Sequence, residues 1–328
     1  MSRKIIWAAI LAVVVSTSFT ACKTSEPVQE SSVTESSVLE SAESSMEVSE
    51  EVSQQVSVEV SIPKDSSYVA IPNDIILESH EEGYTTPLND FEYHFDGDKA
   101  VITKYTGTSS YLSVPNTIEN LPVTIAENAF EGAKIRILIL PDTLTEIPDE
   151  MCLDCKYLQS VQVPAKLVSI GEAAFKNTPA LTSFVFPETL ESIEYAAFWE
   201  SGISGEITIP AKWKLGYSVF TSCHITKVTF ENGVMEIPDC LFQNNEVLSE
   251  VYISDTVTSI GDWAFSGTKV PQVTVPRTVK TIGNQIFSDF DAPVTNRMQW
   301  KGTMKCYYNS EAYFSAKQYN WKIELLDD

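Results

Sequence analysis

Residues 169–175 read SIGEAAF and residues 259–265 read SIGDWAF, so one seven-residue phrase returns with its isoleucine, glycine and phenylalanine in register. The phrase has eight copies when its isoleucine or leucine is used as the marker, and successive markers lie 22 or 23 residues apart. The eight markers are Ile125, Ile147, Ile170, Ile193, Leu215, Ile237, Ile260 and Ile282. The chain from about residue 91 is therefore a tandem array.

A second phrase precedes each marker: an alternating apolar run that usually ends in proline, as in SVQVP at residues 160–164. The alternation places Val161 and Val163 on one side of a predicted strand and Ser160 and Gln162 on the other. A repeat of 22 or 23 residues is too short for a βαβ crossover, which needs roughly 30. We therefore expect one strand per repeat, with successive strands paired in parallel around a shared core.

The marker phrase is predicted to close the opposite side of each coil. Ile170, Ala174 and Phe175 have the spacing of one short helical turn that buries three side chains. Gly171 is expected where the backbone bends tightly. The phrase recurs because each coil must complete its own part of the core.

These two phrases together resemble the BspA-like leucine-rich repeats of bacterial surface proteins, over about residues 91–290. The apolar residue that opens the strand phrase, a leucine at 158, 181 and 248, is kept in six of eight copies and is replaced by Ser109 and Ser204 in the other two. Cys152 departs from the pattern at the Phe position, and Glu231 and Ser254 depart from it at the Pro position. The resemblance implies a right-handed α/β solenoid of about eight repeats, mainly parallel β-strands with short helical or irregular returns, capped at both ends. It also implies adhesion or matrix contact, as in some members.

The first residues have the form of an export signal. Arg3 and Lys4 precede an apolar run of eleven residues, 5–15, which is too short to span a bilayer. Residues 19–22 read FTAC and resemble a lipobox, which predicts a signal peptide at 1–21 and lipidation of Cys22. The protein is then expected outside the cytoplasm, lipid-anchored to the bacterial membrane and exposed at the cell surface. Cleavage elsewhere, with an unmodified Cys22, is the alternative.

Composition divides the rest of the chain. Residues 22–66 are rich in Ser, Glu and Val, with ten acidic side chains between residues 23 and 66, which predicts a disordered tether. A pre-domain segment and an N-terminal hairpin cap are expected at 67–110, the repeats at 111–296 and a C-terminal cap at 297–328. The hairpin is FEYHFDGDKAVITKY at 91–105. The C-terminal cap is expected to contain an N-cap at Asn309 or Ser310, a short helix through Lys317 and a strand at WKIEL.

Charge and residue chemistry argue against several functions. The net charge of −23 argues against nucleic acid as a partner. The three histidines, at 80, 94 and 224, have no metal-ligand spacing, and no catalytic motif stands out, so we expect no metal, no cofactor and no enzyme activity. Cys152 and Cys155 form a CxxC pair, but they fall on core positions of the repeat. Buried packing is predicted for them, with thiol redox chemistry or a metal role as the alternative.

The outward positions of the strands are the remaining candidate site. Ile137, Ile139, Val185 and Tyr252 are expected to be exposed there, more apolar than solubility requires. The candidate ligand-binding residues are Ile137, Ile139, Gln162, Val185, Thr208, Lys227, Thr229, Glu250, Tyr252 and Thr274. We expect a monomeric, non-catalytic surface lipoprotein that binds a protein or glycan ligand, and an envelope scaffold without an external ligand as the alternative.

Overall fold

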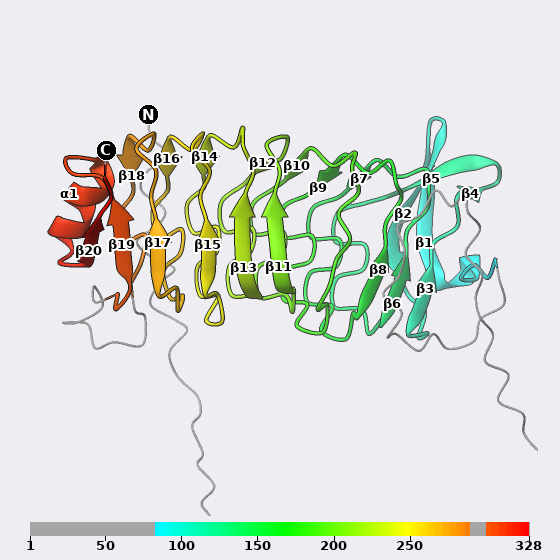
Figure 1. The fold of residues 1–328 in the computed structure, drawn as a ribbon. Helices are drawn as coiled ribbons and strands as arrows, with labels where there is room; N and C mark the ends of the chain where they lie inside the picture. The colour runs from blue at the N-terminus through cyan, green and yellow to red at the C-terminus, as the bar shows by residue number, and fades with distance from the viewer. Residues whose placement is uncertain (1–82, 289–299, 328) are drawn as a thin grey trace, which may run out of the picture. The chain divides into compact units, whose positions relative to one another are not determined.

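The computed structural model describes residues 83–288 and 300–327. They form a β-solenoid with little helix, in which each repeat makes one coil (Figure 1). The predicted stack of parallel strands is confirmed. The predicted signal peptide, Cys22, the tether and residues 67–82 of the pre-domain segment lie outside the described residues, as do residues 289–299 at the predicted end of the repeats.

One wall of the solenoid consists of the predicted strands, which lie side by side in Figure 1. Its members are β3 (Tyr111–Ser113), β6 (Ile137–Ile139), β8 (Ser160–Gln162), β11 (Ser204–Ile209), β13 (His224–Phe230), β15 (Glu250–Tyr252), β17 (Gln272–Thr274), β19 (Thr303–Cys306) and β20 (Lys322–Leu325). All pair in parallel, in three groups: β3-β6-β8, β11-β13-β15 and β17-β19-β20. We call the outward side of this wall the strand face.

A second wall contains the marker residues. Its strands are β7 (Glu146–Ile147), β9 (Ser169–Ile170), β10 (Ser192–Ile193), β12 (Lys214–Leu215), β14 (Glu236–Ile237), β16 (Ser259–Ile260) and β18 (Thr281–Ile282). Markers from successive coils are partners, as in Ile193 with Ile170 and Ile260 with Ile237. Each strand has only two residues, because the chain turns immediately afterwards.

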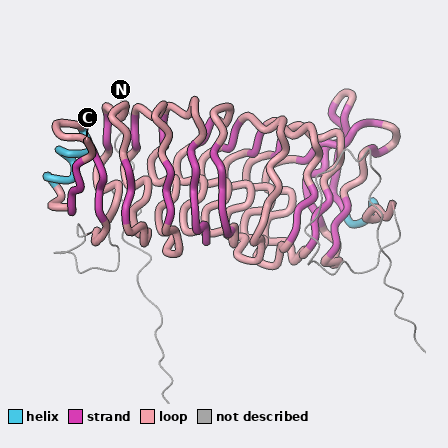
Figure 2. Tube along the Cα trace, viewed as in Figure 1, coloured by secondary structure: helices cyan, strands magenta, loops and turns pink. Residues whose placement is uncertain are grey.

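The return after each marker is a series of turns, not the predicted helical turn (Figure 2). Ala173 and Asn177 have φ of 51° and 56°, in the left-handed region, and equivalent residues of the other coils do the same. A helical turn is thereby excluded, although Ile170, Ala174 and Phe175 are fully buried as predicted. We call the outer surface of these turns the return side.

Gly171 is required by a close approach between coils, not by the tight bend that we expected. A Cβ atom on Gly171 would lie 2.4 Å from Oδ1 of Asp149 and 2.7 Å from its backbone nitrogen. The same Oδ1 accepts a 2.7 Å hydrogen bond from the backbone N–H of Glu172. Four coils further along the chain, Asp239 makes the same arrangement with Gly261 and the backbone N–H of Asp262. The recurring glycine therefore lets an aspartate of one coil bind the backbone of the next.

The core contains a column of stacked rings, which we call the aromatic spine. Its rings are Phe175, Phe198, Phe220, Phe242, Phe265, Phe287 and Trp300. Neighbouring centroids are 4.3–6.0 Å apart and the rings are nearly parallel, at 5–17°. Burial of each large side chain contributes about 1.5–3 kcal/mol. The spine is thus a major source of cohesion between coils.

One predicted strand is missing from the wall. Residues 181–187, LTSFVFP, form no strand, so β8 and β11 belong to separate groups. The two inward positions hold Phe184 and Phe186, whereas no other strand phrase carries a ring at both of these positions. Phe184 contacts the spine rings Phe175 and Phe198 at 5.3 and 5.1 Å. We attribute the missing strand to these rings, whose volume keeps the backbone out of pairing distance; we call this break the strand gap.

The predicted caps are present at both ends of the described region. At one end, β1 (Phe91–Asp96) and β2 (Lys99–Tyr105) form the antiparallel hairpin after the 3-10 turn η1 (Leu88–Asp90), and β5 (Leu121–Ile125) joins β2 and β4 (Thr117–Ile118). At the other end lies α1 (Glu311–Gln318). Its N-cap is Ser310, whose hydroxyl accepts a hydrogen bond from the N–H of Tyr313.

Candidate binding surface

The strand face carries the residues predicted to bind a ligand, but the coils present them unequally. Val185, Thr208, Glu250, Tyr252 and Thr274 are exposed, Ile139, Gln162, Lys227 and Thr229 are partly buried, and Ile137 is buried. Val185 and Tyr252 are 42% and 53% exposed. The accessible part of the face therefore lies from the strand gap to β17.

The prediction that Ile137 is exposed is wrong: its side chain is only 5% exposed. The segment before the hairpin lies beside β3, the first strand of the face. The backbone N–H of Thr86 donates to the carbonyl of Ser113, and the N–H of Ser113 donates to the Thr86 hydroxyl, both at 2.9 Å. Tyr111, the partner of Ile137 in the sheet, contacts the ring of Tyr84 at 5.7 Å. At this end of the strand face, β3 is thus already in contact with residues 84–86 of the same chain.

The centre of the accessible face holds a network of charged and aromatic side chains. Nζ of Lys227 lies 2.9 Å from Oε2 of Glu206 on the neighbouring strand, and 5.8 Å from the ring centroid of Tyr252 on the other side. The Tyr252 hydroxyl donates a 3.0 Å hydrogen bond to Glu250. The bond with Glu206 raises the pKa of the Lys227 ammonium, and the bond with Glu250 raises the pKa of the Tyr252 hydroxyl. These contacts hold three strands' side chains in one arrangement.

Sequence reasoning omitted Glu206 from the candidate residues and did not detect this network. The signal was present, because the repeat spacing places Glu206 and Lys227 side by side in the sheet. Opposite charges at equivalent positions of adjacent coils predict such an ion pair.

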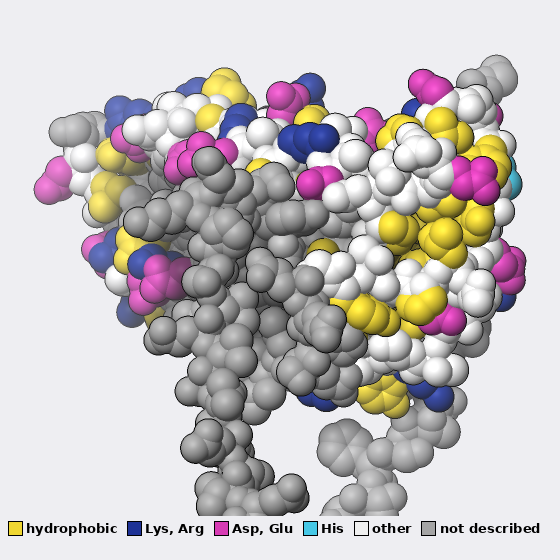
Figure 3. Space-filling view, turned by 90° about the vertical axis from the view of Figure 1, so that its right-hand side faces the viewer, with side chains coloured by type: hydrophobic (Ala, Val, Ile, Leu, Met, Phe, Trp, Pro, Cys, Tyr) yellow, Lys and Arg dark blue, Asp and Glu magenta, His cyan; other side chains and the backbone are white. Residues whose placement is uncertain are grey.

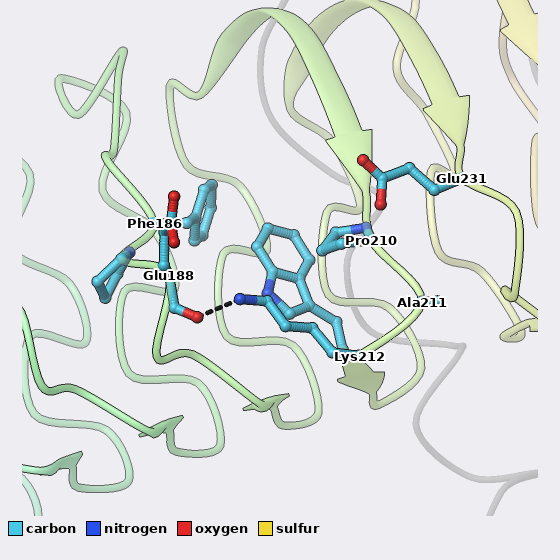
Figure 4. Close-up of a pocket in the computed structure, with 8 residues that line it drawn as sticks. Phe186, Glu188, Pro210, Ala211, Lys212 and Glu231 are labelled. Atoms are coloured by element: carbon cyan, nitrogen blue, oxygen red, sulfur yellow. Dashed lines mark hydrogen bonds between the residues drawn. The ribbon is translucent and has the colours of Figure 1, made fainter.

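A pocket that the sequence did not predict lies at the edge of the strand face beside the strand gap (Figure 4). Its volume is about 490 Å³. Its walls are Phe186, Pro187, Glu188, Pro210, Ala211, Lys212, Trp213 and Glu231. These residues follow the strand positions of three successive coils, so the pocket opens where the strands end.

Hydrophobic side chains also reach the surface at the N-terminal end of the solenoid (Figure 3). Leu88 and Phe95 are 40% and 44% exposed there. They belong to η1 and β1, the elements of the cap. Phe95 lies in the predicted hairpin and Leu88 in the segment predicted before it, and the sequence did not predict an exposed hydrophobic surface on either.

The cysteine pair has the buried setting that packing predicts. Cys152 and Cys155 are fully buried and form no disulfide with each other. Cys155 donates to the carbonyl of Phe130 at 3.0 Å, as Cys223 does to Phe198 at 3.2 Å and the Asn245 amide does to Phe220 at 2.7 Å. Cys155 and Cys223 therefore lie at the repeat position that Asn245 has in another coil, and all three side chains donate to a backbone carbonyl there.

Burial opposes thiolate formation at Cys152 and Cys223. It raises the pKa of Cys152 well above the usual range, with a further rise from the neighbouring Cys155, and it raises the pKa of Cys223 to about 12. A reactive thiolate needs the opposite shift.

Residues 83–288 and 300–327 contain no group of three or more His, Cys, Asp or Glu side chains placed to hold a metal ion. His94 and His224 are exposed on β1 and β13. Within the same residues, no helix has the length and apolar character needed to cross a membrane.

The family of the chain follows from its repeats. The sequence model of the BspA type leucine rich repeat region matches six copies, over residues 106–204 and 168–292. The chain belongs to this family. The BspA-type repeats account for the two phrases of each coil, and the resemblance seen in the sequence is confirmed.

Solved structures share the solenoid fold. A leucine rich repeat protein of T. pallidum is 22% identical, with a TM-score of 0.51 over 74% of this chain and 98% of its own. A leucine-rich repeat protein of Bacteroides ovatus is 18% identical, with a TM-score of 0.53 over 74% of this chain and 67% of its own. A leucine rich cell surface protein of Faecalibacterium prausnitzii is 25% identical, with a TM-score of 0.46 over 70% of this chain and 55% of its own. No curated protein matches the chain.

Proposed function

We propose that this protein is a non-catalytic binding protein that holds a protein partner on the strand face between the strand gap and β17. The observation that carries the proposal is the exposed network of Glu206, Lys227, Glu250 and Tyr252. It combines a large aromatic side chain with charges of both signs. Exposed aromatic anchors surrounded by polar groups are typical of sites that bind proteins.

The rigidity of the face favours binding. Its backbone is fixed by pairing, with Thr208 opposite Thr229 and Thr229 opposite Tyr252. The side-chain contacts around Lys227 restrict rotamers before any partner arrives. Because association must order mobile side chains, a surface that is already ordered binds with a smaller entropic penalty.

The proposed place of action is the outer surface of a bacterial membrane. The support lies in the sequence: a positively charged start, a short apolar core and Cys22 at a lipobox-like position. A single acyl chain binds a bilayer only marginally, so the lipoprotein pattern of several chains on Cys22 is what would hold the protein there. A Cys22→Ala variant should be released into the medium or remain uncleaved. Unchanged membrane fractionation and mass would contradict the anchor.

The binding proposal is tested by two matched variants. Val185→Thr combined with Tyr252→Ser removes the exposed anchors of the strand face, whereas Glu172→Gln combined with Glu194→Gln alters exposed side chains on the return side. The chain is screened against an array of purified extracellular proteins, and the affinity of any binder is measured for both variants. We expect the strand-face variant to lose at least about tenfold in affinity, since anchor side chains carry most of the energy of an interface.

The return-side variant should bind like the wild-type protein. Circular dichroism and the melting temperature of both variants must match the wild-type values, so that lost binding reports on the surface. Equal affinity of the two variants for a confirmed binder would show that the strand face is not the site.

A further inference from the structure

The pocket beside the strand gap has an aromatic wall. The rings of Phe186 and Trp213 lie 5.0 Å apart and are tilted by 59°. Pro187 and Pro210 extend this wall on either side. Phe186 is only partly buried, because the strand gap leaves its coil out of the sheet. An aromatic wall of this kind offers ring faces to a ligand that carries positive charge.

Two carboxylates belong to the same pocket. Glu188 and Glu231 both line it, and both are exposed. Within the described part of the chain, neither carboxylate has an ion pair or a hydrogen bond. The cation of the pocket, Lys212, donates its hydrogen bond to the backbone carbonyl of Glu188, so it leaves both carboxylates without a partner (Figure 4). The pocket therefore retains more negative than positive charge after its own contacts are made.

The charge of the whole chain acts in the same direction. The net charge of −23 raises the local concentration of cations and repels anions. Anionic glycans are disfavoured for this reason, and a neutral sugar gains nothing from the field. A guanidinium group is suited to both walls, because it stacks on aromatic faces and binds carboxylates through a planar set of donors.

We propose that this pocket receives an arginine side chain of the protein partner that is bound on the strand face. The inference rests on the proposed function and specifies the partner's chemistry. The pocket adjoins the face, since Pro210 follows β11 and Glu231 follows β13 directly. A partner segment that crosses the exposed Thr208 therefore reaches the pocket at the end of the same strand.

The experiment uses the full chain with ¹⁵N-labelled tryptophan. The probe is a capped pentapeptide with a central arginine between Gly and Ser residues, and the control peptides carry glutamine or glutamate in its place. The indole N–H of Trp213 has no hydrogen-bond acceptor in the described structure, so its resonance is a local reporter, assigned with a Trp213→Phe variant. We expect the arginine peptide to shift this resonance, with an affinity at least about tenfold above that of the glutamine peptide. The shift should weaken with added salt.

A matched pair of variants tests the carboxylates. Glu188→Gln combined with Glu231→Gln should weaken the arginine peptide about tenfold, whereas Glu172→Gln combined with Glu194→Gln, which removes the same charge from the return side, should change its affinity less than about twofold. A Trp213 resonance that does not respond to millimolar arginine peptide would overturn the inference. Equal affinity for the arginine and glutamine peptides, or a response to a neutral oligosaccharide instead, would also overturn it.

The outcome is separable from that of the proposed function. If the Val185 and Tyr252 variant loses a partner while the arginine peptide has no effect, the strand face stands and the pocket assignment fails. If the peptide binds as expected but the strand-face variant keeps its partner, the pocket is a cation site and the strand face is not the interface.

Discussion

Truncation of one ring in the aromatic spine should destabilise the solenoid more than truncation of any exposed aromatic side chain. Phe220 is fully buried and stacks on Phe198 and Phe242, each at a centroid distance of 5.7 Å. The ring of Phe186 makes an edge-to-face contact with it, with the two centroids 6.3 Å apart. A buried Phe→Ala change costs about 3–5 kcal/mol, because the transfer energy of the ring is lost and a cavity remains. Three ring contacts place Phe220→Ala in the upper part of this range, at about 4 kcal/mol.

The assay is thermal and urea unfolding followed by circular dichroism. At 2–4 °C per kcal/mol for a unit of this size, Phe220→Ala should lower the melting temperature by roughly 8–16 °C. Tyr157→Ala is the control, because Tyr157 is 58% exposed and its truncation should cost less than about 0.5 kcal/mol. A melting temperature of Phe220→Ala within 3 °C of the wild-type value would refute the view that the stacked rings hold the coils together.

Three further changes test the coil contacts. Burial raises the pKa of Cys223 from 9.0 to about 12, so this thiol ionises at lower pH in the unfolded chain than in the folded one. The free energy of unfolding should therefore fall as the pH rises from 9 towards 12. Cys223→Ala should flatten this dependence on pH, and an unchanged slope would contradict a buried thiol at Cys223. Gly171→Ala should cost about 1–3 kcal/mol in urea unfolding, since its Cβ would meet the backbone of Asp149, and a cost near zero would mean that the coils are not in close contact there. Asn245→Ala should cost about 1–3 kcal/mol, because its amide bonds the buried carbonyls of Phe220 and Phe242; a smaller loss than in the exposed variant Thr208→Ala would count against this role.

The repeat pattern was sufficient to predict the parallel strands, and local turn and N-cap residues were sufficient to predict the hairpin and the capping helix. The period of the repeat and the alternation of apolar residues indicate which side chains are buried, and these buried positions are the same in every coil. The pattern could not predict the conformation of the returns, since a turn and a helical turn bury the same positions, such as Ile170 and Phe175. The left-handed residues there include Ala173, a residue type that gives no sequence signal for positive φ.

The candidate site was predicted less well than the fold. The alternation at residues 182–186 is the same as in the other coils, and only the size of Phe184 and Phe186 marks the strand gap and the pocket beside it. The hydrogen bonds between Ser113 and Thr86 join the first strand of the face to a segment outside the repeat, so the repeat pattern carries no information about them. The pair of Glu206 and Lys227 was within reach of sequence reasoning, because it requires only the register of adjacent coils.

The backbone hydrogen bonds between coils affect how the number of repeats in a protein of this kind can change. Along the spine from Phe175 to Phe265, the N–H of each phenylalanine donates to the carbonyl just before the next ring, as in Phe175 to Ala197 and Phe198 to Val219. These bonds join main-chain atoms, so a coil accepts any neighbour of the same period regardless of its surface residues. Unequal recombination that inserts or removes a whole repeat would preserve every such bond at the new junction. The number of coils, and with it the length of the strand face, is therefore open to selection without a new fold being required.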